Sequence, residues 1–407
     1  MSKVNLALIG CGDIAAISHL TGYARLDSIN IVAVCDLCEE KARSIVDRAL
    51  AAERRLGGEK IEVIQQMKPK VYTDFREMLE SEPKIDAVDI CIPHRDHHKV
   101  AVACLEAEKD VLIEKPLGIT IRACKKMIDT AQRYGKVIAV AEEVRKSEDV
   151  RAVNWAIKQG YIGDPRMLLW IDAEERLHEW GWRDHKLEAG GGWILDGGVH
   201  YADLYRYYLG EAKMVYGKTM RYEPFRYKHG PHAFMQEYVW PPGPKKTDPI
   251  KVDIEDTATA TIEFENGVLV QWIYTCAAPG KVLRERVLYG TEGYIDLARG
   301  RLVSKEKNLS IKELKKEFLA TLTEDERRRL FPAGQNHPEG NVIGDFCDAI
   351  LNDRKPEIDG LQGLKDVAIP MAVYESAWLD EPVKVKDIEE CRIENYQQEI
   401  NEALNIS

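Results

Sequence analysis

Short apolar runs and longer segments of helical periodicity alternate through the first third of the chain. Each apolar run has the length of a strand, and each intervening segment has the apolar spacing of an amphipathic helix. Strands that alternate with helices predict a parallel, doubly wound sheet. We therefore expect an α/β domain over residues 1–146. Its predicted strands lie at residues 4–9, 31–35, 85–92, 110–113 and 137–140.

The pattern changes after residue 147. One helical segment is followed mainly by strands, including residues 257–264 and 268–274, which are joined by a hairpin turn at Asn266-Gly267. This predicts an α+β domain over residues 147–386 with a large, mostly antiparallel open sheet. Its alternating face is available for packing on helices or on another subunit.

Three further segments have distinct compositions. Residues 222–249 are rich in Pro, Tyr and His and have little periodicity, so we expect a lid or an oligomer contact there. Residues 305–329 are highly charged and are predicted to form a solvated helical excursion. Residues 387–407 are predicted to form a charged helical tail.

Composition narrows the class of protein. With 407 residues, of which 45% are hydrophobic and 31% charged, the chain predicts a soluble globular protein of two domains. A net charge of −11 without a basic stripe argues against nucleic-acid binding. No apolar run approaches the ~20 residues of a membrane span, and the first predicted strand leaves no room for a signal peptide. Nine cysteines, mostly within apolar elements, indicate reduced thiols and a cytoplasmic location.

The first predicted strand is followed at once by a glycine-rich turn. Gly10 permits the tight turn, and Gly12 allows the backbone to approach a pyrophosphate at the start of the helix that Asp13 and Ile14 open. The second strand ends in Asp36, about twenty residues further on. This strand–turn–helix–strand–acid order is that of a Rossmann dinucleotide site, with a tight turn and a solvated acid as the alternative interpretation.

Asp36 also indicates which dinucleotide is bound. Its carboxylate accepts hydrogen bonds from both hydroxyls of the adenosine ribose, and it repels a 2′-phosphate. NAD is therefore favoured over NADP. Lys41 and Arg43 lie close in sequence and keep NADP open as the less favoured cofactor.

The strand at residues 85–92 ends in a loop that contains three histidines. Asp96 stands where the N-cap of the next helix belongs, which favours a capped loop over a metal site. We expect Ile92 and Pro93 to line the cofactor side of the sheet. His94 or His97 is a candidate contact for the nicotinamide.

The next strand ends in Glu114-Lys115-Pro116. Ligands of an open parallel sheet lie beyond the carboxyl ends of its strands, so Lys115 is expected to point at whatever the sheet binds. The alternative is a surface amine paired with Glu114.

A glycine-rich stretch in the second domain contains a second reactive pair. The glycines at 190–192 are predicted to open one helix that carries both Asp196 and His200 on one face, with Cβ atoms ~5–6 Å apart. Gly197 and Gly198 leave the adjoining surface open for a ligand or for the other domain. An acid–histidine pair of this kind also occurs as a purely structural feature.

Taken together, these motifs resemble the glucose–fructose oxidoreductase / inositol dehydrogenase / rhizopine-catabolism (Gfo/Idh/MocA) family. The likeness extends over residues 3–385 and is carried by the glycine turn, the loop after residue 92, Glu114-Lys115-Pro116 and residues 190–200. It implies an NAD(P)-dependent oxidoreductase that forms a homodimer or homotetramer through the sheet of the second domain. The implied catalytic and substrate-binding residues are Lys115, Asp196 and His200.

The resemblance also implies further contacts at the site. Arg145 matches an element that lines the family's cleft, and Glu143 stands there in place of a common asparagine and is a candidate substrate contact. Trp182 and Arg183 resemble a pair that faces the cofactor from the second domain. Trp180, Trp182 and Trp193 are open to two interpretations, as a stacking surface for a sugar ring or as core.

The mechanism that follows is a hypothesis. A secondary hydroxyl of a sugar or cyclitol loses its proton to His200, since a histidine titrates near neutral pH, while Lys115 stabilises the developing negative charge on the oxygen. Either Lys115 or His200 can carry the proton. Two alternatives stay open: a redox-assisted glycosidase that oxidises, eliminates and reduces again on retained NAD, and an NAD-bound sensor or inactive homologue.

Overall fold

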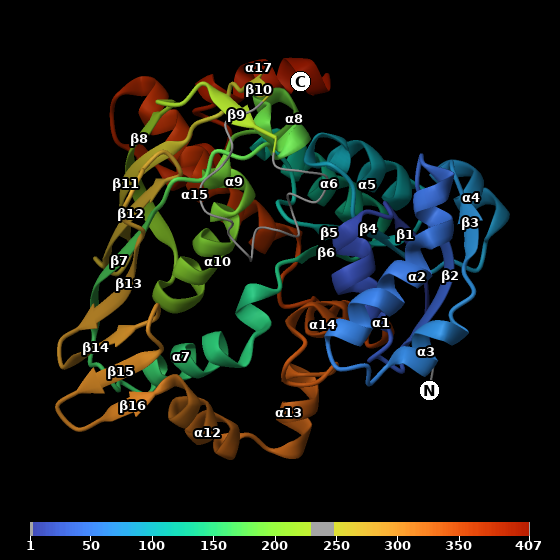
Figure 1. Ribbon diagram of the computed structural model, residues 1–407, viewed down its shortest axis with the longest axis horizontal. Helices are drawn as coiled ribbons and strands as arrows, with labels where there is room; N and C mark the ends of the chain where they lie inside the picture. Colours follow the sequence, from blue (N-terminus) through green and yellow to red (C-terminus); the bar gives the residue numbers. More distant parts are fainter. Residues whose placement is uncertain (1–2, 229–247, 407) are drawn as a thin grey trace. The chain divides into compact units, whose positions relative to one another are not determined.

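The computed structural model describes residues 3–228 and 248–406. The chain divides into two compact units (Figure 1). The first unit contains residues 1–118, 123–151 and 319–364, and the second contains residues 119–122, 152–318 and 365–407. The sequence predicted a first domain that ends near residue 146. The structure adds residues 319–364, from much later in the chain, to the first unit.

The first unit is built on a parallel six-stranded sheet in the order β3-β2-β1-β4-β5-β6. The doubly wound sheet expected from the sequence is confirmed. The order of its strands reverses direction between β1 and β4, and open α/β sheets bind their ligands beyond the carboxyl ends of the strands at such a point. The strands are β1 (Val4–Ile9), β2 (Ile29–Cys35), β3 (Lys70–Tyr72), β4 (Ala87–Ile90), β5 (Asp110–Glu114) and β6 (Ile138–Ala141).

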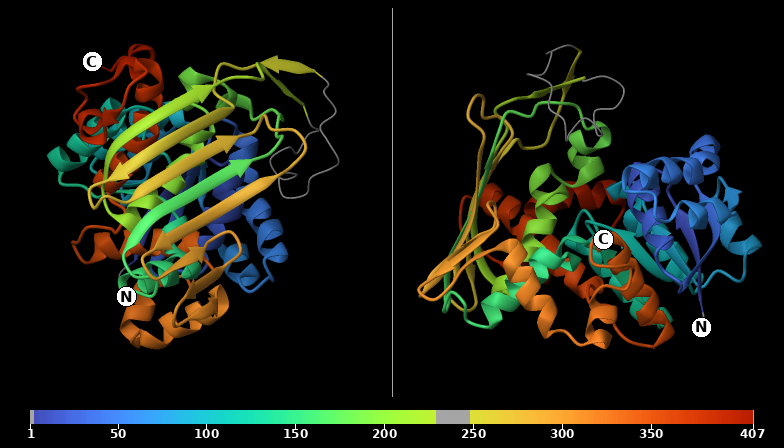
Figure 2. Two further views of the ribbon diagram at one scale, coloured as in Figure 1. Left: turned by 90° about the vertical axis from the view of Figure 1, so that its left-hand side faces the viewer. Right: turned by 60° about the horizontal axis from the view of Figure 1, so that its bottom comes forward.

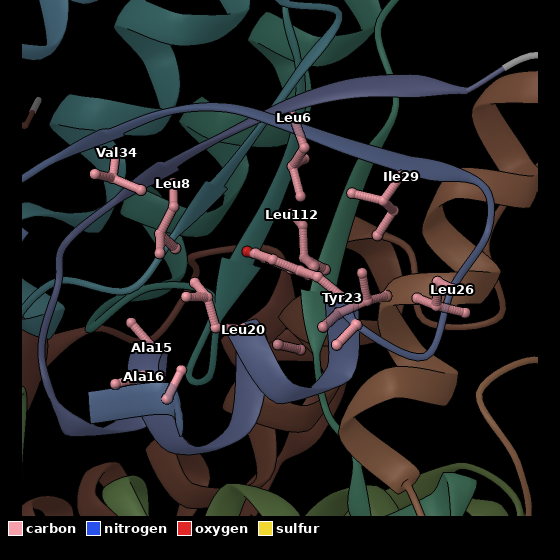
Figure 3. Packing of buried hydrophobic residues seen from close by; sticks show 14 of the residues in the cluster. Leu6, Leu8, Ala15, Ala16, Leu20, Tyr23, Leu26, Ile29, Val34 and Leu112 are labelled. Atoms are coloured by element: carbon pink, nitrogen blue, oxygen red, sulfur yellow. The ribbon is translucent and has the colours of Figure 1, made fainter. Parts of the chain in front are cut away.

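Helices connect these strands and bury their apolar side chains against the sheet. Figure 3 shows one part of this core, where Leu20 and Tyr23 lie close to Leu6, Leu8 and Leu112 of the strands. The helical segments of this part of the chain are η1 (Ala15–His19), α1 (Leu20–Tyr23), α2 (Glu39–Arg55), α3 (Ile61–Gln66), α4 (Phe75–Ser81), η2 (His94–Asp96), α5 (His97–Glu106), α6 (Ile121–Tyr134) and η3 (Val144–Lys146).

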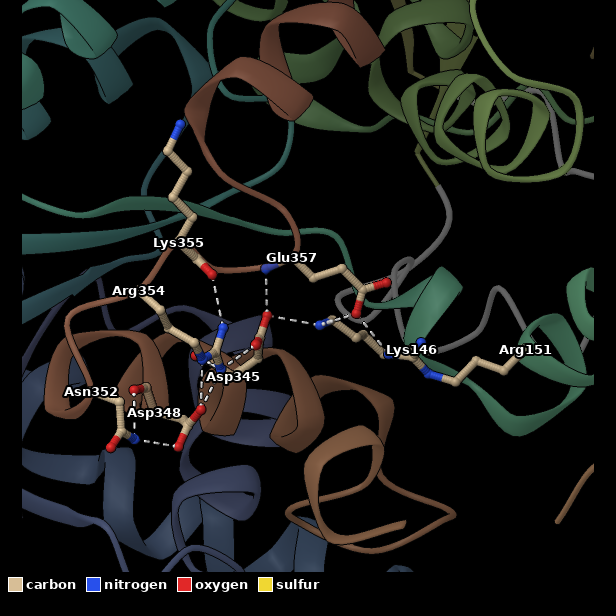
Figure 4. A network of polar contacts seen from close by, with 8 residues as sticks. All are labelled: Lys146, Arg151, Asp345, Asp348, Asn352, Arg354, Lys355 and Glu357. Carbon is tan, nitrogen blue, oxygen red and sulfur yellow. Dashed lines mark hydrogen bonds and ion pairs between the residues drawn. The ribbon is translucent and has the colours of Figure 1, made fainter. Parts of the chain in front are cut away.

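The returning segment completes the first unit. It includes α13 (Glu324–Leu330) and α14 (Pro338–Leu351), and α14 packs against β1, β5 and β6. A buried ionic network joins it to the end of the Rossmann chain: Lys146 contacts Asp345 at 2.9 Å and Glu357 at 2.8 Å (Figure 4). Arg151 binds the same Glu357 carboxylate at 2.9 Å, and Lys146 and Arg151 together hold the pKa of Glu357 well below the usual range.

The second unit contains a nine-stranded sheet in the order β16-β15-β14-β13-β7-β12-β11-β8-β17. Neighbouring strands are antiparallel except β7 and β12, so the mostly antiparallel sheet is confirmed. The hairpin at Gly267, whose φ is +84°, joins β11 to β12 as predicted. The strands are β7 (Pro165–Ala173), β8 (Ala212–Met220), β11 (Thr257–Phe264), β12 (Leu269–Thr275), β13 (Leu283–Gly290), β14 (Gly293–Asp296), β15 (Arg301–Ser304), β16 (Asn308–Ser310) and β17 (Val383–Lys384).

Helices of this unit cover one face of the sheet, and Figure 2 shows the other face without a helical cover. Trp170 and Trp272 pack under α10 against Tyr205, and Gly217 of β8 lies against Val373 of α15. The segments are α7 (Glu148–Lys158), η4 (Gly181–Asp184), α8 (Lys186–Ala189), α9 (Trp193–Asp196), α10 (Gly198–Leu209), α12 (Ile311–Thr321), α15 (Gly360–Leu379), α16 (Val385–Glu389) and α17 (Asn395–Leu404).

The two charged segments differ from each other. Residues 305–329 contain α12 and the start of α13, so their helical character is confirmed, although Leu314 and Phe318 are buried. The tail is helical but packed: in α17 the Tyr396 ring stacks on Tyr374 at 4.4 Å, and its hydroxyl donates to the Gly190 carbonyl at 3.1 Å. The tail therefore supports the glycine stretch of the same unit.

Two short strands, β9 (Phe225–Tyr227) and β10 (Pro249–Lys251), pair with each other at the ends of the Pro-rich segment. Most of the predicted lid or oligomer contact at residues 222–249 lies outside the described residues. Within the described part of the chain, no helix combines the length and the apolar character that crossing a bilayer requires.

Candidate active site

The glycine turn after β1 is shaped by a close backbone approach. Gly10 has φ +93°, and a Cβ atom there would lie 2.2 Å from the carbonyl oxygen of Cys91. At Gly12, by contrast, no heavy atom of the described residues beyond its two chain neighbours lies within 4 Å of an added Cβ. Gly10 is therefore required by the fold, whereas Gly12 leaves open space at the end of the turn. That is the arrangement a pyrophosphate needs.

Asp36 is held beside this turn by the backbone. One carboxylate oxygen accepts a hydrogen bond from the Cys11 N–H at 2.8 Å, and the other accepts from the Cys38 N–H at 2.8 Å. Each oxygen keeps a second lone pair for a ribose hydroxyl. Arg43, one of the two nearby cations that kept NADP open, is bound to Glu39 at 2.9 Å. These residues fit NAD.

The side chain of Asp13 takes another direction. Arg48 on α2 lies 3.3 Å from the Asp13 carboxylate and also donates to the carbonyl of Cys11. Asp13 and Arg48 thus brace the turn from its outer side. Ile14 is the N-cap residue of η1 and already has helical backbone angles, so the helix that points at the turn starts where the sequence predicted.

The carboxyl end of β5 is fixed by two contacts. The Lys115 N–H donates to the Glu114 carboxylate at 3.1 Å, so the acid folds back onto the backbone of its neighbour. His97 lies below, with Nδ1 2.9 Å from the carbonyl oxygen of Pro116 and Nε2 3.0 Å from that of Ile92. Lys115 therefore follows a strand end that is anchored on both sides.

These contacts correct the prediction for His97. Its ring is fully buried, burial lowers its pKa, and both ring nitrogens face backbone carbonyls. The ring has no polar atom to offer to a nicotinamide and instead holds the loop. His94 packs edge-on against it at 5.4 Å and stays the candidate contact of this loop, with Ile92 and Pro93 beside it. Asp96 occupies the N-cap position of α5, but its side chain makes no capping hydrogen bond.

Sequence reasoning missed a buried polar cluster behind Glu114. His19, at the end of η1, places Nδ1 2.6 Å from the Asp89 carboxylate and Nε2 2.9 Å from the Glu114 carboxylate. Tyr23 donates to the same Asp89 oxygen at 2.5 Å. The available signal was Asp89 itself, an acid in the middle of the buried strand β4.

A metal ion does not explain this cluster. His19, Asp89 and Cys91 offer three ligand atoms close together. Two ligands of one tetrahedral zinc ion, each about 2.0–2.1 Å from the metal, lie about 3.3 Å apart. The 2.6 Å separation between His19 and Asp89 is shorter and is that of a strong hydrogen bond with a proton between the two atoms.

In the second unit, Asp196 and His200 lie on successive helices. Asp196 ends α9 and His200 is the third residue of α10, with Gly197 between them in a helical conformation. A Cβ at Gly197 would meet the Trp193 ring at 2.5 Å, and one at Gly198 would meet Trp272 at 2.6 Å. The predicted open surface is therefore wrong, because tryptophans of the same unit fill the space beside both glycines.

Arg183 and Trp182 contact the acid from η4. The Arg183 Nε lies 3.4 Å from Asp196, and its guanidinium stacks on the Trp182 ring at 4.2 Å. The family resemblance implies that both residues face the cofactor from this unit. In the structure, Arg183 pairs with the Asp196 carboxylate of the same unit.

A small pocket of ≈ 40 Å³ lies next to Asp196 and is lined by aromatic and charged residues of the same unit. The Arg176 guanidinium lies 4.8 Å from Trp180 and 4.5 Å from Trp193, and the Trp193 ring also stacks on Tyr274 at 5.7 Å. Since Arg176 and Tyr274 already occupy the Trp193 ring, the structure favours the core interpretation of this tryptophan over sugar stacking.

Asp184, on the wall of this pocket, gives a pH-dependent prediction. Burial raises the pKa of its carboxyl from 3.8 to about 6, although the Trp180 N–H donates to it at 2.6 Å. The folded protein therefore holds the Asp184 proton more tightly than the unfolded chain does. Because of this difference, the free energy of unfolding of the wild type falls as the pH rises from 3.8 to about 6. Asp184→Asn should gain stability relative to wild type over this interval and keep that gain above it.

Urea unfolding at several pH values measures this gain. Asp325→Asn, which removes an acid whose side chain is 97% exposed, is the matched control and should show no such step. A stability difference between Asp184→Asn and wild type that is the same at every pH would contradict the assignment.

The remaining predicted residues belong to the first unit. Glu143 and Arg145 follow the end of β6, where Arg145 lies in η3. The candidate residues are thus divided: the glycine turn, Asp36, the loop after β4, Lys115, Glu143 and Arg145 are in the first unit. Trp182, Arg183, Asp196 and His200 are in the second unit.

Comparison with known proteins identifies both units. Residues 4–142 match the GFO_IDH_MocA family, described as "Oxidoreductase family, NAD-binding Rossmann fold". Residues 150–296 match the family described as "GFO/IDH/MocA C-terminal domain". The two matches adjoin each other in the order expected from the sequence and include the glycine turn, Lys115, Asp196 and His200.

Individual relatives are more distant. D-glucoside 3-dehydrogenase of Escherichia coli (strain K12) is 28% identical over 282 residues, which cover 68% of this chain and 71% of that protein. Glycosyl hydrolase family 109 protein 1 of Shewanella sp. (strain ANA-3) is 30% identical over 194 residues, 46% of this chain and 38% of that protein. A solved structure of levoglucosan dehydrogenase in complex with NADH has a TM-score of 0.70 and 22% identity, and covers 94% of this chain and 99% of that one. At this identity the structural likeness shows the fold.

Proposed function

Because the chain belongs to the Gfo/Idh/MocA family of oxidoreductases with an NAD-binding Rossmann fold, we propose that it oxidises a secondary hydroxyl of a sugar, cyclitol or sugar derivative. NAD, when bound, would accept the substrate's hydride. Glycosides and anhydrosugars are the first substrates to test, since D-glucoside 3-dehydrogenase and levoglucosan dehydrogenase are among its relatives.

One observation carries the proposal. The glycine turn follows β1, Asp36 follows β2 and Lys115 follows β5, so all three lie at the carboxyl edge of one parallel sheet. This edge is where open α/β sheets bind their ligands. The position of this amine, in a unit whose turn and acid fit NAD, supports a role for Lys115 in acting on a substrate next to the cofactor.

The proposed roles of the three reactive residues follow from their chemistry. Lys115, as an ammonium, donates a hydrogen bond to the reacting hydroxyl oxygen and stabilises the negative charge that develops there. His200 accepts the hydroxyl proton as general base. Asp196, oriented by Arg183, holds the substrate or the imidazole. Glu143 and Arg145 are proposed to line the same site from the end of β6.

A spectrophotometric screen tests this function. The purified protein is mixed with NAD or NADP and with glycosides, anhydrosugars, inositols and sugar acids, and the formation of reduced cofactor is followed. We expect net NADH formation in proportion to the oxidised substrate. Absence of turnover with every sugar and cyclitol, by a protein that binds NAD, would reject the dehydrogenase.

The likeness to a glycosyl hydrolase family 109 protein supports a second candidate function. In a redox-assisted glycosidase the hydride returns to the sugar, so a glycoside is cleaved without net NADH formation. Release of the aglycone from a chromogenic glycoside, with NAD retained on the purified protein, would favour this function. The same assay with added free NAD separates the two, because only a dehydrogenase accumulates NADH.

Asp36 is proposed to set the cofactor preference. Asp36→Asn removes the charge but keeps one acceptor oxygen, so we expect the ratio of kcat/KM for NAD to that for NADP to fall roughly tenfold or more. Asp47→Asn on the exposed face of α2 loses the same charge and serves as the control. An unchanged ratio in Asp36→Asn would show that this carboxylate does not select the cofactor.

We further propose that the protein is a cytoplasmic homodimer or homotetramer. All nine cysteines are free thiols, which supports a reducing compartment. The uncovered sheet face carries exposed apolar side chains on four strands, which supports pairing with a second copy through this face. They are Met167, Tyr216, Leu269 and Tyr289. Light scattering on the purified protein measures the assembly, and a monomer would contradict it.

A further inference from the structure

The buried cluster behind the carboxyl end of β5 has no part in the function proposed so far. It joins three elements of the first unit: His19 comes from η1, Asp89 from β4 and Glu114 from β5. Strands β4 and β5 are direct neighbours, and Asp89 pairs with Leu112 in their register. The cluster therefore connects the helix that follows the glycine turn with the strand that ends at Lys115.

The geometry sets the protonation of His19. Its two ring nitrogens face two carboxylates, at 2.6 Å and 2.9 Å, and its side chain is only 3% exposed. A neutral imidazole has one N–H and would present a lone pair to the other acid, whereas an imidazolium donates to both. Although burial lowers the pKa of His19, Asp89 and its hydrogen bond raise it well above 6.5. The two contacts and the raised pKa both favour the imidazolium form of His19.

The titratable groups around the ring support this charge. Tyr23 lies on α1, which directly follows η1, and is a neutral phenol, because burial raises the pKa of Tyr23 well above 10. After β4, the Cys91 sulfur lies 3.6 Å from Nδ1, and burial raises the pKa of this thiol too. On α14, behind Tyr23, burial likewise raises the pKa of the Cys347 thiol. Asp89 and Glu114 are the two carboxyl groups that face the ring.

The contacts continue from His19 to Lys115. One oxygen of Glu114 accepts from His19 Nε2, and the other accepts from the backbone N–H of Lys115. The orientation of this carboxylate is therefore set from behind by His19, and the carboxylate in turn holds the backbone of Lys115.

We propose that His19, doubly hydrogen-bonded between Asp89 and Glu114, is a positioning residue that keeps the Lys115 amine directed at the substrate. The inference rests on the proposed function, because it presumes that Lys115 acts on the reacting oxygen. His19 would then contribute to turnover although it touches neither the substrate nor the cofactor. A displacement of the amine by about 1 Å can cost up to ~10²-fold in rate.

Substitution of His19 tests the proposal. His19→Gln keeps a polar group but cannot carry the charge, so we expect kcat to fall roughly 10- to 100-fold with little change in the KM for NAD. Tyr23→Phe is the matched control: it removes a hydrogen bond from the same Asp89 oxygen and leaves the contact between His19 and Glu114 intact. If both variants lose similar stability but only His19→Gln loses turnover, the effect is one of positioning. Equal kcat in His19→Gln and wild type would overturn it.

The pH profile gives a readout that a purely structural role would not change. Asp89→Asn removes the main group that raises the pKa of His19. In this variant His19 should lose its proton at a lower pH than in wild type, so kcat should decline as the pH rises through that lowered pKa. Wild type should show this decline only at higher pH. A loss of activity in Asp89→Asn that is the same at every pH would contradict the proposal.

A third measurement separates the inference from the function. The NMR titration of the His19 ring nitrogens, in protein labelled at histidine, reports its charge without any turnover and should show an imidazolium at neutral pH. A neutral ring would overturn the inference even in an active enzyme. A charged ring in a protein that oxidises no sugar or cyclitol would instead overturn the proposed function.

Discussion

Replacement of Lys115 by alanine is expected to lower kcat by about 10²–10³-fold, because it removes the cation that stabilises the developing charge on the substrate oxygen. The KM for NAD should stay within about threefold of wild type, since an interaction made mainly in the transition state affects turnover and not cofactor binding. Steady-state kinetics with NAD and a substrate found in the screen measure both parameters.

A second lysine provides the control for this experiment. Lys99 lies on the exposed side of α5 in the same unit. Lys99→Ala removes the same charge from the unit without touching the carboxyl edge of the sheet, and should keep wild-type kcat. Lys115→Arg is a further useful variant, because it keeps the charge but changes the shape of the donor. An unaltered turnover number in Lys115→Ala would refute the role of this residue.

The same substitution at two neighbouring glycines is expected to have opposite consequences. Gly10→Ala should destabilise the protein by roughly 2–4 kcal/mol, because φ is +93° and the new Cβ would lie 2.2 Å from the Cys91 carbonyl oxygen. Gly12→Ala should change stability by about 0.5 kcal/mol or less, since no described atom lies within 4 Å of its Cβ. It should nevertheless weaken NAD binding about tenfold or more, because the methyl group occupies the space of the pyrophosphate.

Thermal unfolding and calorimetric titration with NAD distinguish these outcomes, and each variant is the control for the other. A stable Gly10→Ala protein would show that the close approach between the turn and Cys91 is not required. Wild-type NAD affinity in Gly12→Ala would place the pyrophosphate elsewhere, and the dinucleotide would then have to bind away from the turn.

The elements that could be predicted are those whose signal is local. Five strands of the Rossmann sheet are short, mostly apolar runs, and the glycine turn and the hairpin at Gly267 are set by a few adjacent residues. The edge strand β3 was not predicted, because its three residues, Lys70–Tyr72, form no apolar run. The return of residues 319–364 to the first unit leaves no such signal, because α14 is an ordinary amphipathic helix. Contacts between residues far apart along the chain, such as the ion pair between Lys146 and Asp345, hold α14 in the first unit.

The site shows the same division. Lys115 and Asp36 could be found because each ends a recognisable strand. His19 could not, since its partners Asp89 and Glu114 lie 70 and 95 residues away along the chain. The glycines at 197 and 198 were predicted to admit a ligand because they lack side chains, and this was wrong because Trp193 and Trp272 take the space. The sequence shows which positions are small, and only the packing shows what fills them.

We propose above all that Lys115 of the first unit and His200 of the second act on one hydroxyl group next to NAD. A crystal structure of the protein with NAD and a sugar or cyclitol substrate tests it most directly. We predict that the Lys115 Nζ and a ring nitrogen of His200 both lie within about 2.6–3.2 Å of the same substrate oxygen. A complex in which the two side chains contact different oxygens, or in which either one faces away from the substrate, would contradict the account.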